Sequence, residues 1–257
     1  MTPFWNALDM ARVGIGILAA ASFAALAAPA LAQTCAAKSG PRMAALVELY
    51  TSEGCNSCPP ADRWLSATVP AAANGTPAIA LAFHVDYWDR LGWKDPFASS
   101  EWTKRQQTYA ENWKAESVYT PAFVLNGREW RNTTIPVVND AAPGVLKATV
   151  HDSNAVMISF QPAKGSSEKF DVYLARLGFG IAVNVRAGEN NGRSLKHDFV
   201  VLSLVREKMS SGTQELRLAP VSESLGRPER SAFAAWVAKE GDINPLQAVG
   251  GWLPAMP

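Results

Sequence analysis

The stretch LVELYTSEGCNSCPPADRWL, residues 46–65, decides the fold that we expect for this chain. It opens with strand-forming residues, is broken by a polar turn at residues 51–54, and then presents Cys55 and Cys58 with two residues between them. Two prolines follow at once, and proline suits the first turn of a helix, where a missing N–H group costs little. The order predicts a strand, a turn and a helix, with Cys55 at the helix N-terminus.

The position and spacing of the two cysteines indicate thiol chemistry. Unpaired backbone N–H groups and the helix dipole favour a thiolate over a thiol at a helix N-terminus. A second thiol one turn further on can attack a mixed disulfide formed by the first. The pattern therefore predicts a thiol–disulfide oxidoreductase. Cys55 is the expected exposed nucleophile and Cys58 the shielded resolving thiol, and the two form a disulfide when oxidised.

Other uses of a Cys-x-x-Cys pair remain as alternatives. A zinc site needs four ligands, and the sequence has no second Cys-x-x-Cys or His pair. Covalent haem attachment needs a histidine directly after the second cysteine, where Pro59 stands. Two thiolates with a histidine could hold Cu(I) in a copper-binding or copper-delivery protein, although His84 and His197 are not at ligand spacing. A binding module with an inert structural disulfide is the other alternative, and the redox interpretation needs no cofactor.

The first 32 residues have the features of a secretory signal peptide. Arg12 gives a positive start, residues 13–28 form an alanine-rich apolar run, and Ala30-Leu31-Ala32 is a cleavage site. The apolar run is short for a spanning helix, so we expect no membrane span after cleavage. The sequence thus predicts a periplasmic or secreted protein.

Composition and cysteine usage fit an exported globular protein. The chain has 257 residues, of which 48% are hydrophobic, and a net charge of +1. This balance gives no indication of a nucleic-acid partner. An oxidising compartment permits disulfides, so the expected partners are protein thiols or disulfides there. Cys35 is left over from the pair, and its pairing with Cys55 or Cys58 is a minor alternative.

The segment after the cysteines alternates helix and strand signals. Residues 59–69 predict the helix that follows the pair. Residues 78–86 are a near-continuous apolar run, which is typical of a strand buried on both faces. Residues 97–116 predict a second helix, capped by Ser99 or Ser100.

The remainder of the chain is dominated by strand signals. Residues 118–127 predict a strand that starts at a proline and ends in an Asn-Gly hairpin turn, with residues 129–131 as the return strand. Residues 137–150 predict a closing helix broken by Pro143. Beyond them, a sandwich-like all-β unit is predicted from short strands at 156–161, 169–176, 181–186, 199–207 and 215–218. Residues 231–240 fit a helix or a strand, and a strand is favoured.

Four blocks of the sequence resemble an exported thioredoxin-like family, the domain of unknown function DUF1223. They are VELYTSEGCNSCPPAD at 47–62, HVDYWDRLGWKDPFAS at 84–99, SVYTPAFVLNGR at 117–128 and GENNGRSLKHDFVV at 188–201. The resemblance implies an α/β fold. In this fold, residues 44–150 form a thioredoxin-like domain with the Cys-x-x-Cys at a helix N-terminus. Residues 151–257 form a C-terminal all-β, sandwich-like extension. The resemblance does not supply a substrate.

Site residues carry over only at matching positions. Cys55 and Cys58 match the attacking and resolving cysteines of thioredoxin-like proteins, and Pro121 matches their cis-proline beside the active site, with Thr120 before it. Glu48 is expected to stand in for a buried acid beneath the pair, where it would accept the proton of Cys58. Alternation along the strand could instead turn Glu48 to solvent.

Several other polar and aromatic residues have two interpretations each. His84 is a satisfied core histidine or a ligand, and the core histidine is favoured. The polar segment 189–193 with His197 could contact the first domain or a partner, or be a plain turn. The remaining candidates could line a groove by the site or form a packed aromatic loop; they are Asp86, Trp88, Asp89 and Trp93.

Overall fold

A computed structural model describes most of the chain beyond the expected leader. The described residues are 35–71, 78–132, 134–136, 143–151, 154–163, 168–222, 225 and 228–254. The signal peptide predicted at residues 1–32 lies outside them. Within these ranges no helix has both the length and the apolar character needed to cross a membrane.

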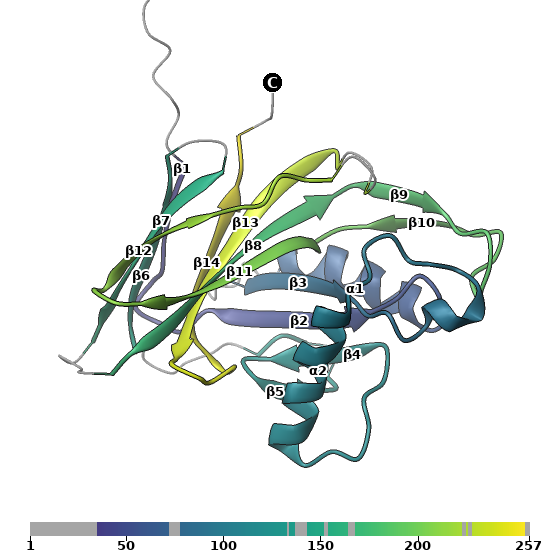
Figure 1. Ribbon diagram of the computed structural model, residues 1–257, viewed down its shortest axis with the longest axis horizontal. Helices are drawn as coiled ribbons and strands as arrows, with labels where there is room; N and C mark the ends of the chain where they lie inside the picture. Colours follow the sequence, from purple (N-terminus) through teal and green to yellow (C-terminus); the bar gives the residue numbers. More distant parts are fainter. Residues whose placement is uncertain are drawn as a thin grey trace, which may run out of the picture. The chain divides into compact units, whose positions relative to one another are not determined.

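Eight strands form one large sheet in the order β14-β13-β8-β11-β3-β2-β4-β5 (Figure 1). The strands are β2 (Ala45–Thr51), β3 (Ala78–His84), β4 (Ala122–Leu125), β5 (Arg128–Trp130), β8 (Phe170–Phe179), β11 (Val200–Met209), β13 (Arg230–Lys239) and β14 (Pro245–Trp252). Strands β2 and β3 are parallel, and β11 joins β3 in parallel where Val200 pairs with Ala82. The other pairings in this sheet are antiparallel.

The remaining elements pack on this sheet or extend from it. A four-stranded sheet has the order β1-β6-β7-β12, and β9 and β10 form a separate hairpin. Their bounds are β1 (Cys35–Lys38), β6 (Gly144–Val150), β7 (Ala155–Pro162), β9 (Ile181–Asn184), β10 (Ser194–His197) and β12 (Thr213–Arg217). The helices are α1 (Cys58–Ala71), α2 (Ser100–Trp113) and the short 3-10 helix η1 (Asp89–Leu91).

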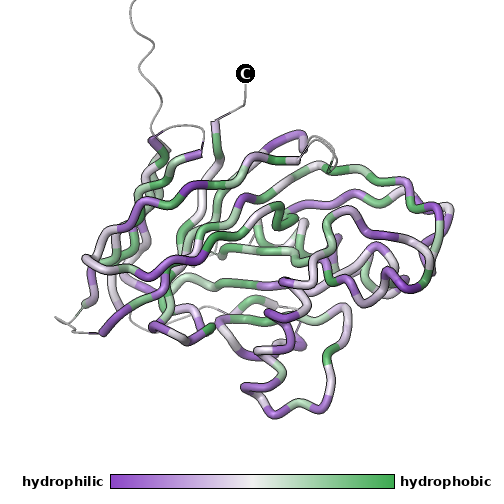
Figure 2. The backbone as a smooth tube through the Cα atoms, in the orientation of Figure 1, coloured by the Kyte–Doolittle hydropathy of each residue, from purple (hydrophilic) through white to green (hydrophobic). Residues whose placement is uncertain are grey.

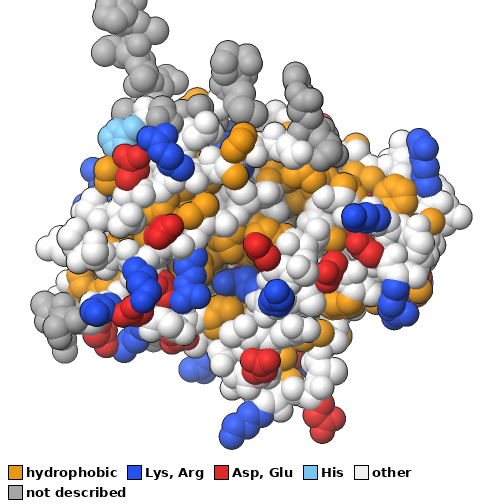
Figure 3. All heavy atoms as spheres, in the orientation of Figure 1, with side chains coloured by type: hydrophobic (Ala, Val, Ile, Leu, Met, Phe, Trp, Pro, Cys, Tyr) orange, Lys and Arg blue, Asp and Glu red, His pale blue; other side chains and the backbone are white. Residues whose placement is uncertain are grey.

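The two α-helices cover opposite faces of the large sheet (Figure 1). On one face, α1 packs through Leu65 against Val47 and Leu49 of β2. On the other, α2 packs through Trp102 and Tyr109 in the core that contains the alternate β2 residues. Figure 2 shows hydrophobic stretches along the central strands and hydrophilic ones in the connecting loops. On the face in Figure 3, acidic and basic side chains are interspersed.

The expected α/β fold with a thioredoxin-like domain is wrong. The described part of the chain holds fourteen strands and two α-helices, so the protein is mostly β. The cause is a long-range pairing: β11 occupies the free edge of β3, and β8, β13 and β14 continue the same sheet. This sheet contains strands from both sides of residue 150. The division into 44–150 and 151–257 stays a prediction about separate folding units.

Local predictions were more accurate than the fold class. Ser99 caps α2, because its side chain accepts a hydrogen bond from the Glu101 N–H. The Asn126-Gly127 turn joins β4 and β5 with positive φ at both residues. The helix predicted over 137–150 is wrong where the structure describes it. Residues 144–150 form β6, whose alternating buried and exposed side chains lie against the second core.

Candidate functional site

The cysteine pair lies where the large sheet meets α1. Cys55 and Cys58 form a disulfide, as predicted, with Cα atoms 5.5 Å apart. Cys58 is the first residue of α1, and its N–H donates to the Cys55 carbonyl at 3.2 Å. The Cys55 N–H donates in turn to the Ser52 carbonyl at 3.2 Å. The pair is thus fixed at the N-terminus of a 14-residue helix.

A loop from the C-terminal half covers this turn. The loop connects β9 to β10, and Figure 1 shows it beside the segment that carries η1. The Asn190 side chain is 0% exposed and donates to the Glu53 and Cys55 carbonyls, at 2.8 and 2.9 Å. The Glu189 carboxylate accepts from the Asn56 N–H at 3.0 Å. Segment 189–193 therefore contacts the cysteine turn, one of the two interpretations of its sequence.

The cover changes the expected accessibility of the thiols. Cys55 and Cys58 are both 0% exposed. The prediction that Cys55 is exposed is therefore wrong for the disulfide form, because the Asn190 loop comes from a part of the chain more than 130 residues away. The order in which the reduced thiols react stays a prediction.

Trp88 connects the cysteine turn to the predicted proline. A Cβ added at Gly54 would lie 2.9 Å from the Trp88 Cβ, so the close approach requires glycine before Cys55. The Trp88 indole N–H donates to the Thr120 hydroxyl at 2.7 Å. The Thr120–Pro121 peptide bond is cis, as predicted. Trp88 thus links the turn before Cys55 to Thr120.

A group of polar residues lies beside the disulfide, all of them buried except the partly exposed Asp62, and we call it the imidazole cluster: Thr51, Glu53, Asp62, His84, Asp95 and His197. His84 Nδ1 is 2.7 Å from Asp95 Oδ2, and His197 Nε2 is 3.1 Å from Glu53 Oε1. The centres of the two imidazole rings are 5.1 Å apart. The Thr51 hydroxyl donates to Asp62 Oδ2 at 3.2 Å, and Thr51 pairs with His84 across β2 and β3. Five segments of the chain thus place ionisable groups together.

The charges in the imidazole cluster shift several pKa values. Burial alone would lower the pKa of His84, but the carboxylate of Asp95, with Asp62 and Glu53, raises it to about 9. Burial would raise the pKa of Asp95, yet the charge and hydrogen bond of His84 lower it below its usual value. Burial raises the pKa of Asp62, against the lowering effect of the two histidines. Shifted pKa values of this kind are typical of functional sites.

The hydrogen bonding of the imidazole cluster is incomplete. His84 Nε2 and His197 Nδ1 are buried and have no partner among the described residues. His84 is therefore a buried histidine, as expected, but only one of its nitrogens is satisfied. Buried polar atoms without a partner are rare in folded proteins and call for an explanation.

Glu48 lies elsewhere. Its carboxylate accepts hydrogen bonds from Arg105 Nε and Nη2, at 2.8 and 2.7 Å, and from the hydroxyls of Tyr50 and Tyr109, at 2.9 and 2.8 Å. These partners belong to the α2 side of the sheet, whereas Cys58 begins the helix on the other side. The expectation that Glu48 lies beneath the cysteines is wrong, and so is its alternative, exposure to solvent, because Glu48 is 1% exposed.

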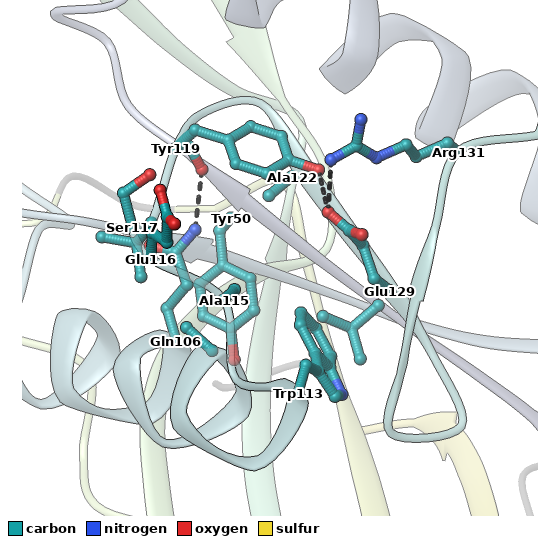
Figure 4. Close-up of a pocket in the computed structure, with 13 residues that line it drawn as sticks. Tyr50, Gln106, Trp113, Ala115, Glu116, Ser117, Tyr119, Ala122, Glu129 and Arg131 are labelled. Atoms are coloured by element: carbon teal, nitrogen blue, oxygen red, sulfur yellow. Dashed lines mark hydrogen bonds and ion pairs between the residues drawn. The ribbon is translucent and has the colours of Figure 1, made fainter.

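A pocket of about 210 Å³ lies under the segment that leads to Pro121. Its wall includes Tyr50, Trp113 and the Tyr119 segment, as Figure 4 shows. At its rim, Glu129 Oε1 accepts from the Tyr119 hydroxyl at 2.6 Å and from Arg131 at 2.8 Å. The Gln106 amide donates to the Tyr119 carbonyl at 2.7 Å and ties α2 to this segment.

The structure unites some of the predicted site residues and adds others. Cys55 and Cys58 are bonded, Thr120 reaches their turn through Trp88, and Glu48 is separate. Sequence reasoning missed Asp62 and Asp95 as site residues, and it left two interpretations open for segment 189–193, which contains Asn190. Each lies in a block that resembles the family, and Asp62 follows Cys58 by one helical turn, which was an available signal. Within the described ranges, no three or more His, Cys, Asp and Glu side chains are grouped as a metal site.

Comparison with known proteins identifies the family and supports the fold. The family model "Protein of unknown function (DUF1223)" matches residues 46–238, so the chain belongs to the DUF1223 family. No curated protein matches the chain.

Two solved structures are similar to the chain. Protein AGR_C_4864 from Agrobacterium tumefaciens has 24% sequence identity and a TM-score of 0.58, over 84% of this chain and 96% of that chain. HBP35 of Porphyromonas gingivalis has 10% identity and a TM-score of 0.55, over 83% of this chain and 76% of that chain. At these identities the likeness concerns the fold alone.

Proposed function

We propose that this DUF1223 protein exchanges disulfides with protein thiols or disulfides through Cys55 and Cys58. The observation that carries the proposal is the pair's position. The disulfide is at the N-terminus of a helix, directly beside a buried cluster of ionisable groups. A helix N-terminus stabilises a thiolate. The neighbouring acids and imidazoles can take up the protons that reduction and oxidation move.

The chemistry needs no group beyond the two cysteines and a partner. In one direction, the thiolate of reduced Cys55 attacks a partner disulfide, forms a mixed disulfide and displaces one partner thiolate. Cys58 then attacks the Cys55 sulfur, which closes the Cys55–Cys58 bond and releases the second partner thiolate. Two electrons pass to the partner. The reverse sequence oxidises a partner dithiol.

Access to the pair requires movement of the Asn190 loop. Neither cysteine is exposed, so a partner's sulfur cannot reach them while Asn190 holds the Glu53 and Cys55 carbonyls. Two hydrogen bonds are a modest restraint, at about 1 kcal/mol each. We therefore propose that partner binding displaces this loop. Export by the segment 1–32 would place the protein where disulfides persist.

The second candidate is a binding module with an inert structural disulfide. The complete burial of both cysteines favours it, since structural disulfides are commonly shielded from thiols. The two candidates differ in whether they catalyse disulfide exchange, because an inert disulfide does not.

A turnover assay separates the two candidates. The protein is supplied with excess glutathione and with a disulfide-bonded peptide whose cleavage releases fluorescence. We expect catalysed cleavage, its loss in Cys55→Ser, and its retention in the matched variant Cys35→Ser. Equal rates for the protein and Cys55→Ser would support the inert disulfide.

A further inference from the structure

Asp62 is the first acidic residue of α1, the helix that begins at Cys58. It follows Cys58 by four residues in α1, so the two side chains share one face of the helix. Its Oδ2 atom accepts a hydrogen bond from the Thr51 hydroxyl. The side chain is partly exposed. A proton that reaches this carboxylate from Cys58 therefore has a route out of the protein.

Four other ionisable groups face this position from separate parts of the chain. Glu53 follows β2, His84 ends β3, Asp95 follows η1 and His197 ends β10. The two imidazoles lower the pKa of Asp62 and the Asp95 carboxylate raises it, while Glu53 acts on His84. His84 and His197 each retain one buried nitrogen without a partner among the described residues. The cluster thus leaves some hydrogen-bonding atoms unpaired, whereas in a purely structural network each polar atom is paired.

We propose that Asp62 accepts the proton of Cys58 when that thiol closes the disulfide, and that His84 and His197 set the pH at which it does so. The proposal rests on the thiol–disulfide exchange proposed above and names its proton acceptor. It assigns to Asp62 the role that the sequence led us to expect of Glu48.

In the mixed disulfide, Cys58 is a thiol and Asp62 a carboxylate. The proton passes from Cys58 Sγ to Asp62, and the thiolate attacks Cys55 Sγ. The Cys55–Cys58 bond forms, the bond from Cys55 to the partner breaks, and the partner leaves as a thiolate that takes a proton from water. Asp62 returns its proton to solvent.

The two histidines affect the pKa of Asp62 through their charge. A positive imidazole nearby favours the ionised carboxylate, so His84 and His197 lower the pKa of Asp62 against the effect of burial. Removal of either imidazole raises the pKa of Asp62. Asp62 then becomes a base only at higher pH, and the resolving step shifts in the same direction.

The two thiol steps can be observed separately with a symmetrical nitrobenzoate disulfide, each half of which is coloured once released. The reduced Cys35→Ser protein, in which Cys55 and Cys58 are the only cysteines, is mixed with this reagent in a single turnover at a series of pH values. Attack by Cys55 releases the first coloured thiolate, and resolution by Cys58 releases the second. In Asp62→Asn we expect the second release to slow about 100-fold near neutral pH, at the low end of general-base effects. The first release stays unchanged.

Three further variants sharpen the result. Asp86→Asn is the matched control, because Asp86 also accepts a threonine hydroxyl, from Thr103 at 2.6 Å, and it should leave both releases unchanged. Asp62→Glu keeps an acid and should restore most of the second rate. His197→Gln should move the pH midpoint of the second release upward, and it carries the test if Asp62→Asn does not fold.

The possible failures are distinct. A first release with a second release that is unaltered in Asp62→Asn at every pH would overturn the role of Asp62. An unmoved midpoint in His197→Gln would overturn the role of the imidazoles. Absence of the first release from the folded, reduced protein would instead refute the exchange activity itself.

Discussion

Two groups of buried charged residues lie on opposite faces of the large sheet, and they differ in how completely their polar atoms are paired. On the α2 side, the Glu48 carboxylate accepts four hydrogen bonds, two of them from Arg105. On the α1 side, the imidazole cluster leaves His84 Nε2 and His197 Nδ1 without partners in the described structure. Both groups are buried, but only the second adjoins the disulfide.

Arg105 shows what a closed network looks like. Its guanidinium lies over four aromatic rings at centroid distances of 5.4 to 5.7 Å; they are those of Phe83, Tyr109, Tyr173 and Trp236. Its charge is paired to Glu48, and aromatic rings cover its faces. Burial of charged residues alone therefore does not indicate a reactive site. Chemistry is indicated where buried ionisable groups remain able to gain or lose a proton beside a reactive bond.

The largest effect is expected when the Glu48–Arg105 network is broken. Glu48→Gln leaves the Arg105 charge buried and unpaired, so we expect the free energy of unfolding to fall by about 3–5 kcal/mol. Urea unfolding measures it. The matched exposed pair is Glu129–Arg131, and Glu129→Gln should cost about 1 kcal/mol or less. The reduction potential of the disulfide should stay the same in both variants. A shift of the potential in Glu48→Gln alone would show that the two faces are coupled.

An intermediate effect is expected at the cover of the disulfide. Asn190→Ala removes two hydrogen bonds to the cysteine turn, of about 1 kcal/mol each, so the loop should open about 10- to 100-fold more often. Reduction of Cys55–Cys58 by dithiothreitol should accelerate by that factor. The neighbouring exposed Asn191 gives the control Asn191→Ala. Equal reduction rates in both variants would mean that the loop does not limit access.

The smallest expected effect concerns the pH dependence of stability. The pKa of His84 rises from 6.5 to about 9 on folding. The stability it contributes is therefore complete below the unfolded value and is lost as pH rises through about 9. Between about pH 7 and pH 10, the unfolding free energy of the protein should fall more steeply than that of His84→Gln, by on the order of 1 kcal/mol. Parallel curves would show that the Asp95 pair contributes no such dependence.

Local signals predicted α1, α2 and the Asn126-Gly127 turn, because their causes lie within a few residues, but they wrongly predicted a helix where β6 lies. Ser99 caps α2 through its own side chain, and Asn126-Gly127 adopts the positive φ angles of a tight hairpin. The fold class depended on the pairing of β11 with β3, between residues more than 100 apart, and no local pattern specifies such a partner.

In the candidate site, too, features with local causes were predicted and those that depend on distant residues were not. The disulfide and the cis Thr120–Pro121 bond were predicted. A contact of segment 189–193 with the first domain was one of two interpretations, but its position over the cysteine turn was not predicted, because it depends on the packing of a distant loop. The face occupied by Glu48 was not predictable either. Residues on both sides of β2 are apolar, so alternation does not reveal which face α1 covers.

The central claim is that Cys55 and Cys58 are a reversible redox pair in the folded protein. The direct measurement equilibrates the protein in a series of glutathione buffers, alkylates free thiols, and determines by mass spectrometry the fraction of the pair that is reduced. We predict one two-electron transition that is approached identically from the reduced and the oxidised protein, within the range in which glutathione buffers poise catalytic disulfides. A pair that stays oxidised in every buffer, or is reduced only as the protein unfolds, would contradict the account.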